Sequence, residues 1–168
     1  PLCWRLSPVL LELELFFLLV CANGAPVLAS KWLKHRFERP IDGGRLWHDG
    51  RPLLGASKTW RGLVAGCLAT GSLSVLAGTG WWFGMLFGLV ALFGDMLSSF
   101  IKRRRGLASS ARATGLDQIP EAFLPMLLAV WWLPLQLVPA LGVVALFVIA
   151  NITLSPLLFR LGIRKKPH

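Results

Sequence analysis

Long apolar segments dominate the chain, and short blocks of charged residues separate them. Such a segment must lie in a protein core or in a membrane, and each is about long enough to cross a hydrocarbon core of ~30 Å as an α-helix. A helix is the expected form in lipid because it satisfies its backbone hydrogen bonds internally. We therefore predict an all-α, polytopic membrane protein with about five transmembrane helices, over residues 8–29, 62–80, 81–100, 119–136 and 137–161.

The connections between these segments alternate between basic and non-basic sequences. The turn at Gly78–Gly80 has no Lys or Arg, and neither does the junction near Pro134 and Pro139. Cytoplasmic loops of membrane proteins collect Lys and Arg, so we predict an external N-terminus and a cytoplasmic C-terminus in the inner (cytoplasmic) membrane. The basic connections are the loops at about 30–61 and 101–118 and the tail, with Lys31, Lys34, Arg36, Arg39, Arg45, Arg51, Lys58 and Arg61 in the first, five more in the second, and Arg160, Arg164, Lys165 and Lys166 in the tail.

Composition supports one integral membrane domain over residues 1–168. The chain is 55% hydrophobic and only 15% charged, which is more apolar than a soluble domain of this size requires. Its net charge of +10 follows from the basic cytoplasmic loops, and there is no basic aromatic module of the RNA-binding type, so nucleic acid is not an expected partner. The three cysteines are far apart and form no CxxC pair, which argues against a zinc site.

A carboxylate interrupts the third apolar segment and is followed by cations. Asp95, Ser98 or Ser99, and Lys102 are spaced so that they share one face of a helix, and Arg103 comes next. An ionisable group at the end of a membrane span normally faces a cavity or a partner. Asp95 is therefore either half of an ion pair that holds neighbouring helices together, or a Mg²⁺ ligand beside phosphate-binding cations.

The second apolar segment is preceded by Gly55-Ala-Ser-Lys-Thr-Trp-Arg-Gly62. It is not a P-loop, because Ser57 stands where that motif needs Gly. We expect Ser57 to cap the following helix, with Lys58 and Arg61 one turn apart at its N-terminus, where an anion would bind. The alternative is an ordinary basic flank of a membrane span.

Five further polar residues lie at the same side of the predicted membrane. Asp42 and Asp49 either cap tight turns or hold Arg45 or Arg51 in place for a ligand, and His48 is expected at the surface. Asp117 is a second carboxylate at the depth of Asp95, and the two carboxylates could hold a metal and a triphosphate together. Asn23 either lines the cavity or satisfies backbone freed by Pro26.

In order, these blocks resemble the CDP-archaeol synthase family, relatives of bacterial CDP-diglyceride synthases. The resemblance covers nearly the whole chain. It rests on Ala22-Asn23…Pro26, Pro40-Ile-Asp-Gly-Gly44, Asp49-Gly-Arg51…Gly55…Ser57-Lys-Thr-Trp-Arg-Gly62, Gly94-Asp95…Ser99-Phe100…Lys102-Arg103 and Leu116-Asp-Gln118. The Lys-Asp and His-Gly-Gly elements of the wider CDP-diglyceride synthase signature are absent, which favours the archaeol-type branch.

The resemblance implies transfer of CMP from CTP to a lipid phosphate, with Mg²⁺ and release of pyrophosphate. Membrane lipids surround such an enzyme, and a homodimer is compatible with the sequence. Asp95 and Asp117 would hold the metal, and these two residues and Lys102 would be catalytic. The substrates would be bound by residues from all of these blocks, namely Asn23, Asp42, Arg51, Ser57, Lys58, Thr59, Arg61, Ser99, Arg103 and Gln118.

Three other functions compete with this interpretation. A transporter of a small anion or lipid would need polar residues through the depth of several spans, whereas this chain has them mainly at the cytoplasmic ends. A structural or assembly protein would not explain both the Gly55–Gly62 and the Gly94–Arg103 patterns. A CTP-dependent polyprenol kinase would be distinguished by its products.

Overall fold

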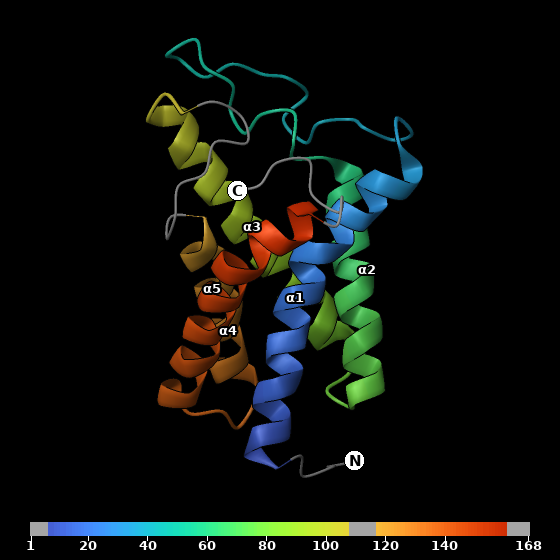
Figure 1. The fold of residues 1–168 in the computed structure, drawn as a ribbon, viewed down its shortest axis with the longest axis vertical. Helices are drawn as coiled ribbons and strands as arrows, with labels where there is room; N and C mark the ends of the chain where they lie inside the picture. The colour runs from blue at the N-terminus through green and yellow to red at the C-terminus, as the bar shows by residue number, and fades with distance from the viewer. Residues whose placement is uncertain (1–6, 108–116, 161–168) are drawn as a thin grey trace.

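Five helices form the protein in this computed structural model, which describes residues 7–107 and 117–160, with side chains as far as Thr153. Figure 1 shows the helices side by side in one bundle. The predicted all-α class and the order of the apolar segments are confirmed. Leu116 and the tail residues Arg164, Lys165 and Lys166 lie outside the described part. The helices are α1 (Pro8–Leu33), α2 (Trp60–Ala77), α3 (Trp81–Arg104), α4 (Gln118–Trp132) and α5 (Leu137–Arg160).

Within the described residues, three helices are long and apolar enough to cross a membrane, namely α1, α2 and α3. Helix α5 is apolar over Leu137–Thr153. Helix α4 has 15 residues, a length of about 22 Å. It ends at Trp132, earlier than the predicted 136, because Leu133 precedes a proline and takes an extended conformation.

Local sequence explains where α2 begins and ends. Thr59 is its N-cap, and the Thr59 hydroxyl accepts a hydrogen bond from the backbone N–H of Gly62 at 3.2 Å. The prediction that Ser57 caps this helix is therefore wrong: Ser57 lies two residues earlier, in an exposed turn. Gly78 ends the helix with a left-handed backbone that few other residues adopt.

Helix α3 is packed tightly between α2 and α4 through its glycines. A Cβ atom on Gly88 would lie 2.1 Å from the Thr70 hydroxyl of α2, and one on Gly94 would lie 2.3 Å from the Pro120 carbonyl oxygen of α4. Small residues at such crossings let helix backbones approach closely in membranes. The first turn of α4 is thereby held beside Gly94, one residue before Asp95.

The polar residues gather at one end of the bundle, where α1 and α3 finish and α2 and α4 begin. The long connection between α1 and α2 crosses this end, and α1 begins at the opposite end (Figure 1). The buried apolar core joins α1, α3, α4 and α5, with Leu15, Leu18, Leu19, Phe87, Met126 and Phe147 among its members. The bundle therefore carries its candidate chemistry at the end that the α1–α2 loop covers.

Candidate functional site

Helix α3 presents its polar residues to the inside of the bundle. Leu89, Phe93 and Leu97 form an exposed stripe at a spacing of four residues. The opposite face carries Asp95, Ser98 and Lys102, of which Ser98 and Lys102 are buried. The predicted shared face is confirmed, and it is directed into the bundle.

Asp95 is ion-paired with a lysine that precedes helix α2. The Lys58 Nζ donates to Asp95 Oδ2 at 2.5 Å, and both side chains are largely buried. The sequence predicted that Asp95 faces cations, and its partner comes from the α1–α2 loop rather than from its own helix. This pair connects the start of α2 to the inner face of α3.

Asp117 forms a second lysine–aspartate pair on the same face of α3. Lys102 Nζ lies 2.7 Å from Asp117 Oδ1, and the Ser98 hydroxyl donates to the Asp117 carbonyl oxygen at 3.5 Å. Ser98 is one helical turn from Asp95, so the fold brings the start of α4 to the same part of α3. The site thus combines groups from the starts of α2 and α4 with the end of α3.

These carboxylates suit Mg²⁺ only together with a phosphate ligand. In the described part of the chain, no group of three or more His, Cys, Asp or Glu side chains could hold a metal ion. Mg²⁺ commonly takes one or two carboxylates and completes its octahedron with phosphate oxygens and water. Asp95 and Asp117 fit that requirement, and each is neutralised by a lysine in this structure.

Asp42 organises the α1–α2 loop. Its carboxylate accepts hydrogen bonds from the backbone N–H groups of Gly44 (3.0 Å), Leu54 (2.9 Å) and Gly55 (3.0 Å). Burial alone would raise the pKa of the Asp42 carboxyl, but these donors together lower it below the ordinary value. The turn-capping interpretation of Asp42 is confirmed, and the carboxylate also ties the loop to the segment that leads to Lys58.

A short hairpin of residues 45–53, called here the tip hairpin, lies at the far end of this loop. Its backbone hydrogen bonds include Trp47 N–H to the Arg51 carbonyl at 2.8 Å and Leu53 N–H to the Arg45 carbonyl at 3.0 Å. Asp49 caps the turn by accepting from the Arg51 N–H at 3.1 Å, as one interpretation predicted.

The side chain of Asp49 is ion-paired with Arg104 of α3 rather than with Arg45 or Arg51. The slight desolvation of Asp49 would raise the pKa of its carboxyl, but the Arg51 N–H and the Arg104 guanidinium lower it below the ordinary value. Nothing in the sequence singled out Arg104 from its basic neighbours. The sequence contains both halves of this contact, an Asp-Gly turn at Asp49 and a basic cluster after the third apolar segment, but it does not indicate that the two meet.

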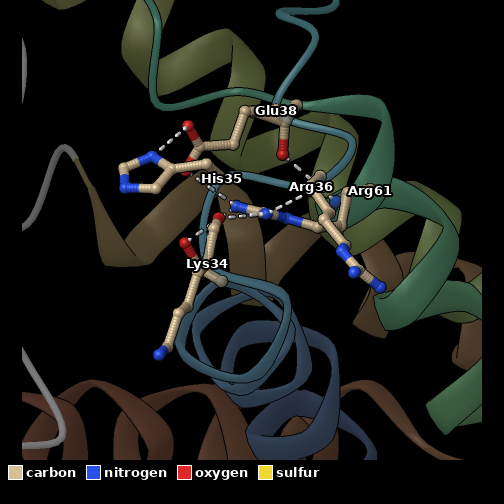
Figure 2. A network of polar contacts seen from close by, with 8 residues as sticks. Lys34, His35, Arg36, Glu38 and Arg61 are labelled. Carbon is tan, nitrogen blue, oxygen red and sulfur yellow. Dashed lines mark hydrogen bonds and ion pairs between the residues drawn. The ribbon is translucent and has the colours of Figure 1, made fainter.

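Arg61 is engaged with the end of α1. Figure 2 shows its guanidinium directed at the turn that follows α1, where Nη1 donates to the carbonyl oxygens of Lys34 at 2.8 Å and Arg36 at 2.7 Å. Nη2 donates to the Ser30 hydroxyl at 3.0 Å, and only 5% of the side chain is exposed. The predicted substrate-binding role of Arg61 is not reflected in these contacts, which are structural.

The other predicted site residues are distributed around the same end. Arg103 and Ser99 are buried on α3, and Gln118 is buried at the start of α4. The Asn23 amide donates to the Leu19 carbonyl at 3.0 Å. Pro26 has no N–H, so the carbonyl oxygen of Ala22 lacks its helical donor. Because the Asn23 amide binds Leu19 instead, the prediction that Asn23 satisfies backbone freed by Pro26 is not supported.

Comparison with protein families places the chain among lipid-synthesis proteins. The family model described as CDP-archaeol synthase, CarS-like, matches residues 10–79 and 76–168. A CDP-archaeol synthase of Aeropyrum pernix is 36% identical over 98% of this chain and 95% of its own length. Another, of Hyperthermus butylicus, is 44% identical over 60% of this chain, and the chain covers 60% of that relative's length.

A solved structure has a similar arrangement of helices. It is described as an intramembrane enzyme for archaeal membrane lipids biosynthesis, and it superimposes with a TM-score of 0.72. The match covers 83% of this chain and 89% of that structure at 30% sequence identity.

Proposed function

Because the chain belongs to the CDP-archaeol synthase family, we propose that it is a membrane-embedded cytidylyltransferase. It transfers CMP from CTP to a lipid phosphate, either phosphatidic acid or archaeol phosphate, and releases pyrophosphate. The observation that carries this proposal is the pair of lysine–aspartate contacts on the inner face of α3. Two carboxylates and two lysines at one end of a membrane bundle are the groups that a metal-bound triphosphate requires.

The proposed orientation has five membrane crossings with the site at the cytoplasmic face. Exposed tryptophans support two membrane boundaries: Trp32 and Trp60 at the end that carries the site, and Trp82 and Trp131 at the other end. Tryptophan is enriched at both interfaces of a bilayer. Lys and Arg are concentrated at the site end, which favours the cytoplasm for that side.

In the proposed reaction, an oxygen of the lipid phosphate attacks the α-phosphorus of CTP and pyrophosphate leaves. No covalent intermediate is needed, so the protein's contribution is positioning and charge neutralisation. Mg²⁺ bound by Asp95 and Asp117 would neutralise charge on the phosphates. Lys58 and Lys102 would bind phosphate oxygens, and buried Arg103 would hold a further anionic group.

Substrate binding then requires an exchange of partners. Each lysine contacts a carboxylate in this structure, whereas the proposed complex pairs the lysines with phosphates and the carboxylates with the metal. Opposite charges remain matched before and after this exchange, so neither state leaves a charge buried alone. The nucleotide and the metal are therefore expected to bind together rather than one after the other.

The test is transfer of label from α-labelled CTP to lipid by the purified protein with Mg²⁺. Phosphatidic acid and an unsaturated archaeol phosphate would be offered separately, with Asp95→Asn beside the wild type. We expect labelled CDP-lipid from the wild type and a loss on the order of 10²-fold or more in the variant. Glu12→Gln, the same chemical change at the opposite end of the bundle, is the control and should keep full activity.

Three outcomes would contradict this proposal. If folded Asp95→Asn protein kept nearly full activity, the metal-binding role of Asp95 would be wrong. If folded wild type labelled neither lipid nor any other lipid phosphate, the transport of a small anion or lipid would be tested next. Formation of CDP and a phosphorylated lipid would instead identify a CTP-dependent lipid kinase.

A further inference from the structure

Arg104, the last residue of α3, makes several contacts with the tip hairpin. Its guanidinium is ion-paired with Asp49, and Nη2 donates to the Pro52 carbonyl oxygen at 2.6 Å. The same group lies 5.1 Å from the ring centre of Phe100 and 5.8 Å from that of Trp47. A charge bound by a carboxylate, a carbonyl and two aromatic rings is held in one orientation.

The hairpin makes a reciprocal contact with the backbone of α3. Arg51 Nη1 donates to the Arg104 carbonyl oxygen at 2.8 Å, which supplies a cation to the C-terminus of the helix. Gly106, in a left-handed conformation, leaves room for this guanidinium: a Cβ there would lie 3.2 Å from Arg51 Nη1. The two arginines thus bind each other's segments.

The base of the loop is fixed differently from the tip. Ile41 N–H donates to the Lys58 carbonyl at 2.8 Å, and Trp60 N–H donates to the Arg39 carbonyl at 3.2 Å. Next to this base, Arg61 is 5% exposed, whereas Arg104 and Asp49 at the tip are 21% and 38% exposed. A partly exposed ion pair contributes little to stability, so the tip should separate from α3 more readily than the base does.

We propose that Arg104 is a positioning residue for the transfer reaction, and this rests on the proposed function. It holds the tip hairpin on the outward face of α3, about half a helical turn around the axis from Asp95. The α1–α2 loop, which crosses the site end of the bundle on its way to this anchor (Figure 1), thereby stays over the bound nucleotide. Lys102 faces Asp117, while Arg104, two residues later, faces the hairpin. One turn of α3 therefore carries both a site residue and the contact that keeps the loop over the site.

The variant Arg104→Met tests this role, with Arg105→Met as the matched control, because Arg105 is exposed and carries the same charge. In hydrogen exchange of the full chain, the amides of Trp47, Gly50 and Leu53 should exchange about tenfold faster in Arg104→Met. The amides of Ile41 and Trp60 at the base should not change. Arg105→Met should exchange like the wild type at both places.

The kinetic result separates positioning from a purely structural role. We expect kcat/KM for CTP to fall by about tenfold in Arg104→Met, with the half-saturating amount of lipid phosphate unchanged, because the lipid reaches the site from the membrane. Asp49→Asn keeps the acceptor for the Arg51 N–H and removes only the charge. It should lower kcat/KM for CTP by about threefold, and it tests the proposal if Arg104→Met does not fold.

Three results would be decisive. Unchanged exchange in the tip hairpin would show that Arg104 does not hold it. Faster exchange with unchanged kcat/KM for CTP would show that the contact is structural only, and would overturn the positioning role. If the wild type itself transferred no CMP, the proposed function would fail, and the exchange comparison would still decide whether Arg104 holds the hairpin.

Discussion

Each carboxylate of the candidate site has its own lysine, and this pairing controls what the site can accept. Lys58 and Asp95 come from different segments, and so do Lys102 and Asp117. The sequence predicted that Asp95 and Lys102 share a helix face, because a spacing of seven residues fixes that relation within one helix. It could not predict which lysine binds which carboxylate, because that depends on how α2 and α4 pack against α3.

A metal-binding experiment tests the proposed exchange of partners. In Lys58→Met the Asp95 carboxylate loses its competing cation, so Mn²⁺, used in place of Mg²⁺, should bind without nucleotide about tenfold more tightly. The measurement is the electron paramagnetic resonance signal of free Mn²⁺ in a titration of the protein. Lys31→Met, at an exposed position near the end of α1, is the control; unchanged or weaker Mn²⁺ affinity in Lys58→Met would argue against the exchange.

At the scale of elements, the junction between α1 and α2 depends on one buried arginine. Helix α1 ends without a glycine, and Lys34 and Phe37 both adopt left-handed conformations, with φ of 45° and 58°. Such residues cost about 1–3 kcal/mol each. Arg61 offsets that cost by binding the carbonyl oxygens of this turn (Figure 2). From the sequence, Arg61 was only a cation one helical turn from Lys58. Its role in binding the turn after α1 could therefore not be distinguished from phosphate binding.

Arg61→Lys keeps the charge and removes the second branch of the guanidinium. We expect the free energy of unfolding to fall by about 2 kcal/mol, because at least one partly buried acceptor loses its charged donor. KM for CTP should stay near the wild-type value in protein that remains folded, since the contacts of Arg61 are with α1 and the following turn. A KM that rose tenfold with stability unchanged would return Arg61 to the substrate-binding residues.

At the scale of the whole molecule, periodicity and charge predicted the helices in their order. The ends of the helices were less predictable, because caps such as Thr59 and stops such as Leu133 depend on single residues. The sequence also gave no indication of the tip hairpin's contact with α3. That contact joins residues 53 positions apart, Arg51 and Arg104.

The proposed orientation can be tested with single cysteines in a chain whose native cysteines are replaced by Ala. Arg105→Cys lies at the site end, and Gln136→Cys lies in the connection between α4 and α5 at the other end (Figure 1). A membrane-impermeant thiol reagent should label Cys at 136 in intact cells and Cys at 105 only in inverted vesicles. The reverse pattern would place the site outside the cytoplasm.

The short helix α4 has a consequence for how the two substrates meet. Its first turn lies beside Gly94, and α3 continues for ten more residues to Arg104, a further distance of about 15 Å. Asp95, one residue after Gly94, is therefore recessed by that order of depth below the rim of the bundle, and Asp117, which contacts Ser98 and Lys102, is recessed by less. In the proposed reaction the lipid headgroup need not leave the bilayer; the water-soluble nucleotide descends into a depression in the membrane surface to reach it.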